Sequence, residues 1–265
     1  SRTKRVEEEV KLRTKELNAL KNTLEEKNLS LHQLIKMKNE LLGIASHDLR
    51  NPLTSIQGYS AFLLTKGDDL SIKKRNNFLK IINTASDNIL KLLNDLLSFS
   101  AIESGQLSLD LKPGNLRELI DEYIEMYTPL AFEKKITLKM NCQNESVAIY
   151  DKPRIGQVLD NLLTNAIKFS PIGGSIEIKL KTENGYKLVS VKDQGPGIKN
   201  EELGNLFQPF KKLSSNPTGQ EKGTGLGLAI AKKMIELHNG VLILESKEGD
   251  GAKFTFKLPI KKHSN

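Results

Sequence analysis

The sequence is poor in cysteine and has no long apolar run. Its 265 residues include a single cysteine, Cys142, which excludes an internal disulfide and a cysteine-based zinc site and fits a reducing compartment. No stretch approaches the ~20 consecutive apolar residues that a membrane-spanning helix needs. The chain also begins without methionine and without an apolar leader, as SRTKRVEEEV. These absences predict a segment of a longer gene product that does not itself cross a bilayer.

Tryptophan is absent, and aromatic residues make up only 5% of the chain. The net charge is +8, from 40 basic and 32 acidic residues, and a basic total raises the question of nucleic-acid binding. The basic residues are mostly scattered lysines, however, and no aromatic stacking platform or arginine-rich helix accompanies them. The sequence therefore favours a solvated, lysine-rich surface and predicts no nucleic-acid partner.

Glycine and proline are missing from the first 42 residues, where apolar residues recur with heptad spacing. One row consists of Val10, Leu17, Leu24 and Leu31, and the other of Val6, Leu20, Leu34 and Leu41. Polar residues interrupt the rows at Arg13, Lys27 and Lys38. A lone amphipathic helix would leave both rows uncovered, so the pattern favours a parallel two-stranded coiled coil.

The helical pattern continues to about Thr65 and resumes over 72–103, after the segment KGDDLS (66–71). Gly67 predicts a stop and Ser71 an N-cap. Apolar residues of the second helix repeat with 4-3 spacing at Phe78, Ile82, Ala85, Ile89, Leu92, Leu96 and Phe99. Because one helical hairpin cannot bury both of its apolar stripes, we expect two copies of the chain to form a four-helix bundle.

The composition of 105–114, GQLSLDLKPG, predicts a linker, and the character of the chain changes after it. Helices are predicted at about 116–134, 153–169 and 226–238, and strands at 136–142, 147–151, 175–182, 187–193, 241–246 and 252–258. Asn184–Gly185 is a hairpin signal. The stretch 195–225 is too long for an ordinary connection and predicts a functional loop. Antiparallel strands with helices on one side predict an α+β sandwich.

His47 is predicted to lie on the exposed face of the first helix. The apolar stripe there comprises Leu42, Ala45, Leu49, Leu53, Ile56 and Leu63, and at 100° per residue His47 lies nearly opposite its centre, together with Asn51 and Thr54. Asp48 can accept a hydrogen bond from one ring nitrogen and leave the other nucleophilic. Pro52 is expected to kink the helix beside His47.

Three clusters predict a nucleotide site. In DNLLTNAIKFSP (160–171), Asn161, Asn165 and Lys168 share one helical face, and carboxamide oxygens with a lysine suit Mg²⁺ and phosphate. In DQGPGI (193–198), Asp193 can accept a hydrogen bond from an amino group, and Gly195 and Gly197 allow close backbone approach.

The third cluster, KGTGLGLAIAKKMIEL (222–237), has three glycines that open an amphipathic helix, an arrangement that presents free N–H groups to phosphate. It differs from a Rossmann fingerprint because no parallel βαβ unit surrounds it, and the Walker Lys–Ser/Thr pair is missing.

HDLRNPLT (47–54) resembles the H box of two-component sensor histidine kinases. The three clusters resemble, in order, the N box, the first glycine box and the second glycine box of the histidine-kinase ATP-binding domain, the Bergerat fold. LFQPF (206–210) is similar to the F box between them, with Phe207 and Phe210 as anchors of a mobile lid. The resemblance covers residues 38–260, with Asp48, Asn51 and Phe169 where Glu, Thr and Tyr are frequent.

The resemblance implies a role for each matching residue. His47 would be the phosphoacceptor, Asp48 would orient its ring and take its proton, and Asn51 would hold the water that dephosphorylates the partner. Asn161 and Asn165 would hold Mg²⁺ and the triphosphate of ATP, with Lys168 on phosphate and Asp193 on adenine. The remaining nucleotide-binding residues would be Phe169, Gly195, Gly197, Phe207, Phe210, Gly223, Thr224, Gly225, Leu226 and Gly227. The resemblance leaves open which lid lysine, Lys211, Lys212 or Lys222, meets the transferring phosphate.

The same resemblance implies the organisation of the protein. A signalling coiled coil (1–37) would precede a dimerisation and histidine phosphotransfer domain (38–104), a linker (105–114) and a catalytic ATP-binding domain (115–262). The partners would be a second copy and the receiver domain of a response regulator, with a sensor domain upstream. The location would be cytoplasmic, with membrane attachment of the full-length protein left open. The alternatives are a non-kinase ATPase of the same fold, a phosphatase-dominant sensor and a purely structural coiled coil.

Overall fold

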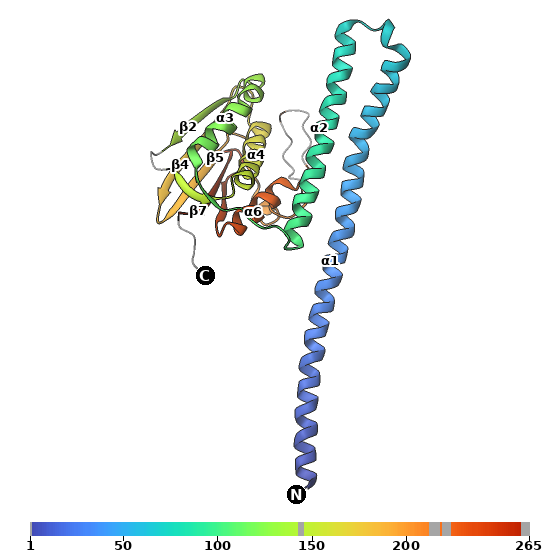
Figure 1. Ribbon diagram of the computed structural model, residues 1–265, viewed down its shortest axis with the longest axis vertical. Coiled ribbons are helices and arrows are strands. Elements are labelled where there is room, and N and C mark those ends of the chain that lie inside the picture. Colours follow the sequence, from blue (N-terminus) through green and yellow to red (C-terminus); the bar gives the residue numbers. More distant parts are fainter. Residues whose placement is uncertain (1, 143–145, 212–217, 219–223, 261–265) are drawn as a thin grey trace. The chain divides into compact units, whose positions relative to one another are not determined.

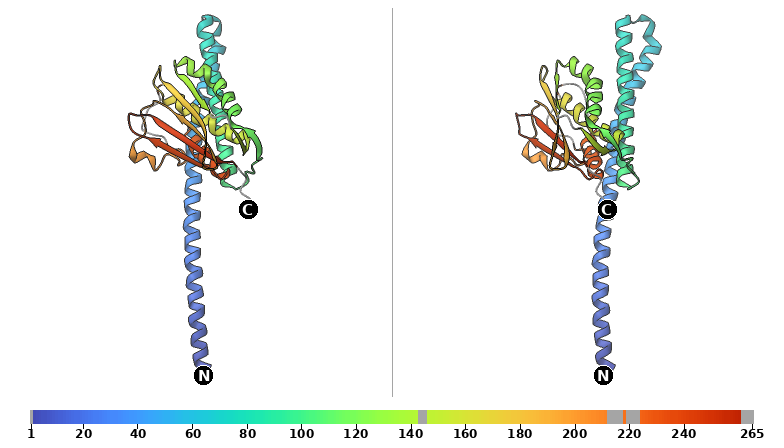
Figure 2. Two further views of the ribbon diagram at one scale, coloured as in Figure 1. Left: turned by 90° about the vertical axis from the view of Figure 1, so that its left-hand side faces the viewer. Right: turned by 60° about the vertical axis from the view of Figure 1, so that its left-hand side comes forward.

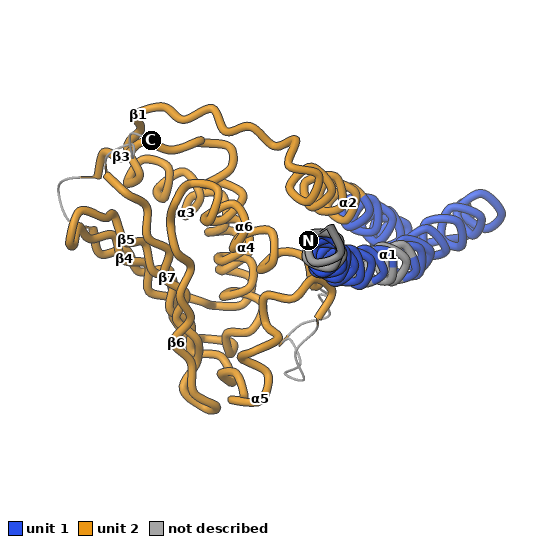
Figure 3. Tube along the Cα trace, turned by 90° about the horizontal axis from the view of Figure 1, so that it is seen from below, with its two compact units in different colours: residues 1–89 blue, residues 90–265 orange. Residues whose placement is uncertain are grey.

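A computed structural model describes residues 2–142, 146–211, 218 and 224–260. The chain divides into two compact units, residues 1–89 and 90–265, which Figure 3 colours separately. The division falls inside one helix, α2 (Ile72–Glu103), so the last turns of this helix belong to the second unit.

The first unit is a helical hairpin. Helix α1 (Arg2–Lys66) runs without a break through Pro52, and the short 3-10 helix η1 (Gly67–Asp69) connects it to α2. The predicted N-cap is confirmed, because Ser71 Oγ accepts a hydrogen bond from the Lys74 amide at 3.4 Å. Close to the connection, the rings of Tyr59 and Phe78 pack with their centroids 5.0 Å apart.

The apolar side chains of the two helices differ in how far they are covered. The predicted stripe of α2 is at least partly covered at every position, and Ala85, Leu92 and Phe99 are buried. Four heptad leucines of α1 whose side chains are described are exposed instead. Leu17, Leu20, Leu24 and Leu31 keep between 56% and 68% of their surface. A row of exposed leucines is expensive in water, so this face of α1 suits a partner helix.

The second unit is an α/β sandwich. Its strands are β2 (Thr137–Cys142), β4 (Ser175–Glu183), β5 (Tyr186–Lys192), β6 (Val241–Ser246) and β7 (Ala252–Pro259). They form one sheet in the order β2-β4-β5-β7-β6. The helices α3 (Leu116–Glu133), α4 (Lys152–Phe169) and α6 (Gly227–Leu237) lie together on one side of this sheet (Figures 1, 2 and 3).

Two expectations about the strands are wrong. The sheet is not wholly antiparallel, because β2 pairs with β4 in parallel, with Leu138 opposite Ile176. The segment 105–114 is also not only a linker. Its end belongs to strand β1 (Lys112–Asn115), which pairs antiparallel with β3 (Val147–Tyr150) in a separate small sheet. A strand that contains Pro-Gly is possible at such an edge, but its composition does not predict it.

Residue-level signals of the second unit are realised in the structure. Asn184 and Gly185 both have positive φ, 51° and 81°, as expected for the tight turn between β4 and β5. Asp151 caps α4 by accepting a hydrogen bond from the Arg154 amide at 3.1 Å. The core between sheet and helices contains side chains with no more than 1% exposure, among them Ile120, Ile155, Leu159, Leu163, Ile176, Ile178, Ile230 and Phe256. The described residues of the long connection before α6 include a short helix, α5 (Asn200–Leu203).

Candidate functional site

His47 lies on the exposed side of α1, as predicted. Its side chain keeps 70% of its surface, and its Nδ1 lies 3.1 Å from Asp48 Oδ1. The Asp48 side chain is 21% exposed, so the carboxylate is partly shielded from water. With Nδ1 engaged by the carboxylate, Nε2 is the nitrogen that carries the lone pair in the neutral ring. Asn51 and Thr54 are exposed on the same helix.

Helix α4 carries the residues of the predicted N box. Asn161 is buried, and its amide nitrogen donates to Gln157 O at 3.0 Å. Its side-chain oxygen lies against Gly227, at the start of α6, where a Cβ atom would overlap it. Asn165 and Lys168 are half-buried, and Lys168 Nζ lies 5.0 Å from the centre of the Phe169 ring. An oxygen ligand is therefore available at Asn161, as Mg²⁺ requires.

Asp193 is buried immediately after β5. Its Oδ1 accepts hydrogen bonds from the amides of Gly195, at 2.8 Å, and Ala252, at 3.1 Å. Burial raises the pKa of this carboxyl, and the two backbone hydrogen bonds lower it again in part. Among the described residues, none donates to Oδ2. The carboxylate is thus fixed through one oxygen and can accept a donor such as an amino group through the other.

The glycines around Asp193 allow this close packing. A Cβ atom on Gly195 would lie 2.9 Å from both Asp193 Oδ1 and Phe169 O. Gly197 has a φ of +70°, and a Cβ atom there would overlap the Lys247 carbonyl oxygen. Gly251, which the sequence analysis did not select, has a φ of +76° and meets the Asp193 carbonyl in the same way. A turn that only glycine can adopt surrounds the carboxylate.

The F box and the second glycine box meet through backbone contacts. The Phe210 amide donates to Gly225 O at 2.9 Å, and a Cβ atom on Gly225 would lie 2.8 Å from Phe210 Cα. Phe210 itself has a φ of +63°, which is unusual for a bulky residue and typical of functional sites. The Phe207 ring lies 5.1 Å from Lys232 Nζ, and Leu226 is fully buried.

Part of the predicted lid lies outside the described residues, namely Gly223, Lys212 and Lys222. Lys211 is described and exposed. Thr218 is described as well, and its amide and hydroxyl both bond to Lys168 O, at 3.1 and 2.9 Å. Thr218 thereby helps to cap a carbonyl in the last turn of α4, which also accepts a hydrogen bond from Lys134 Nζ at 3.5 Å.

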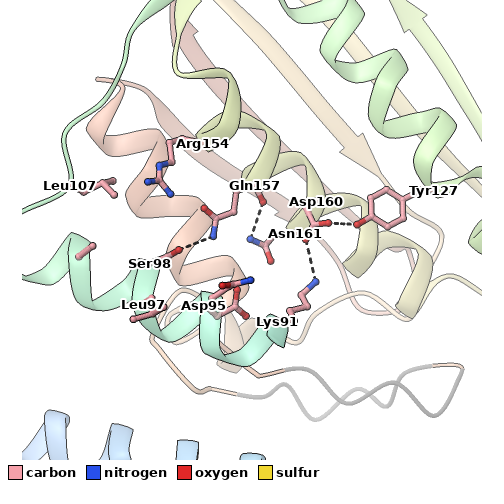
Figure 4. Close-up of a pocket in the computed structure, with 12 residues that line it drawn as sticks. Lys91, Asp95, Leu97, Ser98, Leu107, Tyr127, Arg154, Gln157, Asp160 and Asn161 are labelled. Carbon is pink, nitrogen blue, oxygen red and sulfur yellow. Dashed lines mark hydrogen bonds and ion pairs between the residues drawn. The ribbon is translucent and has the colours of Figure 1, made fainter. Parts of the chain in front are cut away.

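The sequence analysis missed a pocket of about 770 Å³ beside the N box. Its lining residues come from the last turns of α2, from Leu107 after α2, from α3 and from α4 (Figure 4). They include Lys91, Asp95, Ser98, Tyr127, Arg154, Gln157, Asp160 and Asn161. The Tyr127 hydroxyl donates to Asp160 Oδ1, and this bond together with burial raises the Tyr127 pKa. A signal existed at Asp95, because this carboxylate stands between Leu92 and Phe99 in the apolar stripe.

The predicted site residues therefore fall into two sets. His47, Asp48 and Asn51 belong to the first unit, and all the described residues of the predicted nucleotide site belong to the second. Within the second unit, the structure brings Asn161 to Gly227, Asp193 to Gly195 and Phe169, and Phe210 to Gly225. In the described part of the chain, no group of three or more His, Cys, Asp or Glu could hold a metal ion.

Two family models match the chain. Residues 37–105 match the His Kinase A (phospho-acceptor) domain, and residues 150–262 match the histidine kinase-, DNA gyrase B- and HSP90-like ATPase. The circadian input-output histidine kinase CikA of Synechococcus elongatus is 35% identical over 225 residues, which is 84% of this chain and 30% of CikA. The chain thus spans 30% of the length of CikA, and 28% and 25% of the lengths of two other curated relatives.

Solved structures of histidine kinases resemble this one. The catalytic domain of ThkA is 33% identical, with a TM-score of 0.51 over 57% of this chain and 97% of that one. ThkA in complex with the response regulator protein TrrA gives a TM-score of 0.63 at 27% identity, over 84% and 61% of the two chains. Full-length ShkA in complex with AMPPNP gives a TM-score of 0.62 at 26% identity, over 86% and 47%.

No helix within the described residues combines the length and the apolar character that a membrane span requires. The phospho-acceptor match falls on the helices that carry His47, and the ATPase match falls on the sandwich that carries Asn161 and Asp193. The two matches follow each other in the order that the H box and the nucleotide boxes predict. This chain belongs to the sensor histidine kinases of the two-component systems.

Proposed function

We propose that this chain transfers the γ-phosphoryl group of ATP to His47 and then to an aspartate of a response regulator. The observation that carries the proposal is the exposed imidazole of His47, bonded to Asp48 on a helix of phospho-acceptor type, in one chain with an ATPase domain of the histidine-kinase type. The solved complex of ThkA with the response regulator protein TrrA supports a regulator as the phosphoryl acceptor, and the complex of ShkA with AMPPNP supports a nucleotide as the donor.

The chemistry follows from the two ring nitrogens of His47. Nε2 attacks the γ-phosphorus, and the bond from phosphorus to the β–γ bridging oxygen breaks, so ADP leaves. The ring becomes positively charged as it reacts, and Asp48, 3.1 Å from Nδ1, stabilises this charge and accepts the Nδ1 proton. Phosphoryl transfer requires mainly positioning and charge neutralisation, so the remaining residues act on the nucleotide.

In the nucleotide site, we assign the adenine amino group to Asp193 Oδ2. Asn161 and Asn165 would hold Mg²⁺, which would neutralise negative charge on the phosphates when bound. Lys168 contacts a phosphate, and the backbone of Thr224, Gly225 and Gly227 donates to phosphate at the start of α6. The support is the burial of Asp193, the oxygen of Asn161 against Gly227 and the close contact of Phe210 with Gly225.

At the level of the whole protein, we propose a cytoplasmic homodimer that assembles through α1 and α2. The support is the row of exposed leucines on α1. The domain limits 38–104, 105–114 and 115–262 remain a prediction, with the coiled coil of 1–37 carrying input. Asn51 is exposed one turn after His47, and it suits a role in holding water during dephosphorylation of the regulator.

The test is phosphoryl transfer from ATP labelled at the γ-phosphate. The wild-type chain should acquire label that is stable in alkali and lost in acid, as expected for phosphohistidine. His47→Gln should lose the label completely, because no other group replaces the ring nitrogen. Asn165→Ala should reduce labelling at least about 100-fold by weakening the metal site. His32→Gln, at another exposed histidine of α1, is the matched control and should be labelled normally.

Each rival function predicts another result. An ATPase of the same fold would hydrolyse ATP equally well in the wild type and in His47→Gln, with no label on protein. A phosphatase-dominant sensor would bind ATP without labelling and would still remove phosphate from a phosphorylated receiver. Persistent labelling of His47→Gln would overturn the assignment of the phosphoacceptor.

A further inference from the structure

Three polar residues of α2 face the N box and the second glycine box from within the same compact unit. Lys91, Asp95 and Ser98 are spaced at i, i+4 and i+7, so they lie on one face of the helix. Lys91 Nζ lies 3.2 Å from Asp160 Oδ2, Thr224 Oγ1 donates to Asp95 Oδ2 at 3.2 Å, and Gln157 Nε2 donates to Ser98 Oγ at 3.4 Å. Figure 4 shows the first and third of these contacts across the pocket. We call this set of three contacts the α2 clasp.

Asp95, the middle residue of the clasp, is the one whose burial costs the most free energy. Asp95 is only 5% exposed, and burial raises its pKa although Lys91 and the hydrogen bond from Thr224 lower it. A buried carboxylate is unfavourable unless hydrogen bonds and charges compensate for it, and a nonpolar residue of the stripe would avoid the cost. The carboxylate is therefore explained better by its partner Thr224 than by the packing of α2.

Thr224 connects Asp95 to the start of α6. Its hydroxyl donates to Asp95 and accepts a hydrogen bond from the Leu226 amide at 3.2 Å. The Leu226 amide is one of the N–H groups at the start of the glycine-opened helix, where phosphate is expected to bind. While the clasp is closed, Asp95 holds the Thr224 hydroxyl where it engages this donor, so the Leu226 amide is already occupied. This occupation disfavours a triphosphate.

We propose that Asp95 is a positioning residue that acts through Thr224 and couples the end of α2 to nucleotide binding. With the clasp closed, the second glycine box is held in a form that binds ATP weakly. Binding of Mg²⁺-ATP and opening of the clasp then favour each other, because the phosphate needs the Leu226 amide that Thr224 engages while it donates to Asp95. The inference rests on the proposed function, since it concerns the same nucleotide site.

The test compares the affinity of the full chain for AMPPNP with Mg²⁺ by calorimetry. Asp95→Asn keeps the shape but removes the charge, and it should bind about fivefold more tightly, the lower end of usual coupling between sites. Asp87→Asn is the matched control, because Asp87 is exposed on the same helix and accepts a hydrogen bond from Asn83. It should bind as the wild type does. Asp95→Ser is a second variant in case the buried carboxamide impairs folding.

A further comparison tests the route through Thr224. In a Thr224→Val background, the gain from Asp95→Asn should disappear, whereas Thr224→Ser should keep it. Unchanged or weaker affinity in both Asp95 variants would overturn the proposal, and so would an undiminished gain in Thr224→Val. A wild-type chain that fails to bind AMPPNP would refute the proposed function before any variant is compared. Normal labelling of His47 with no effect at Asp95 would refute the clasp alone.

Discussion

The position of the Asp193 carboxylate depends on neighbouring glycines, which have no side chain. Gly195 and Gly251 each approach the carboxylate or the backbone beside it so closely that a Cβ atom would not fit, and Gly197 approaches the Lys247 carbonyl equally closely. The motif DQGPGI (193–198) contains Gly195 and Gly197, so the sequence predicts their role beside Asp193. The motif does not predict the contact of Gly251, because that residue is more than fifty positions away in the chain. The carboxylate and the first two glycines were therefore predictable from sequence, but the complete enclosure was not.

Gly197→Ala is predicted to destabilise the second unit strongly. The new Cβ atom would overlap the Lys247 carbonyl, which is backbone and cannot rotate away, and a φ of +70° is unfavourable for alanine. We expect a loss of about 3 kcal/mol or more in the free energy of unfolding, measured by urea denaturation of the full chain. Gly249→Ala is the control, because its φ of +84° is similar but nothing lies within 4 Å. Gly249→Ala should lower the free energy of unfolding by only about 1 kcal/mol. Equal losses would refute the steric argument.

At the scale of elements, helices α4 and α6 are connected through a buried histidine. His238 Nδ1 lies 2.7 Å from Met234 O, and the Asp151 amide donates to His238 Nε2 at 3.1 Å. Nε2 must be unprotonated to accept this bond, so the ring is neutral, and burial lowers its pKa. His238 is the C-cap of α6, and it forms an uncharged bridge from there to Asp151, the cap of α4.

The stability of the second unit is predicted to decrease as the pH falls below about 6.5. The folded pKa of His238 is lower than the unfolded value, so the unfolded chain takes up the proton first and acid favours unfolding. His238→Gln should lose stability of about 1–3 kcal/mol at pH 7.5, through the buried hydrogen bonds, and should show a shallower decrease between pH 7.5 and 5.5. Urea midpoints across this range measure both effects. The stability of His32→Gln should fall with decreasing pH as that of the wild type does. If the stability of His238→Gln falls equally steeply, a group other than His238 causes the pH dependence.

At the scale of the whole molecule, α1 is a helix of 65 residues, and its described heptad leucines, Leu17, Leu20, Leu24 and Leu31, remain exposed in a single chain. The heptad spacing predicts that a second copy of the chain covers these leucines. A continuous helix can also transmit a rotation about its axis along its length to His47. The proposed input through the coil rests on this continuity. Pro52 leaves the helix unbroken beside His47.

Insertion of one residue after Asn28 is predicted to change the rate of His47 labelling several-fold. One residue rotates the following part of the helix by about 100° relative to the coil, so the leucine rows on the two sides no longer align. Insertion of seven residues is the matched control, because a full heptad restores the alignment and should retain the wild-type rate. Labelling with γ-labelled ATP measures the rates. The same rate in both insertion variants and the wild type would argue against input through the coil.

Sequence alone determined the order of the long helices and of the strands β2 to β7, the exposed histidine and the boxes, because periodicity, glycine and capping residues act over a few neighbouring positions. It did not determine that β2 is parallel to β4, that Lys112–Asn115 pairs with β3, or that Asp95 reaches Thr224. These features join residues far apart in the chain, and their free energy comes from backbone pairing and burial that exist only after folding. Tertiary structure therefore decided which polar groups surround the predicted nucleotide boxes.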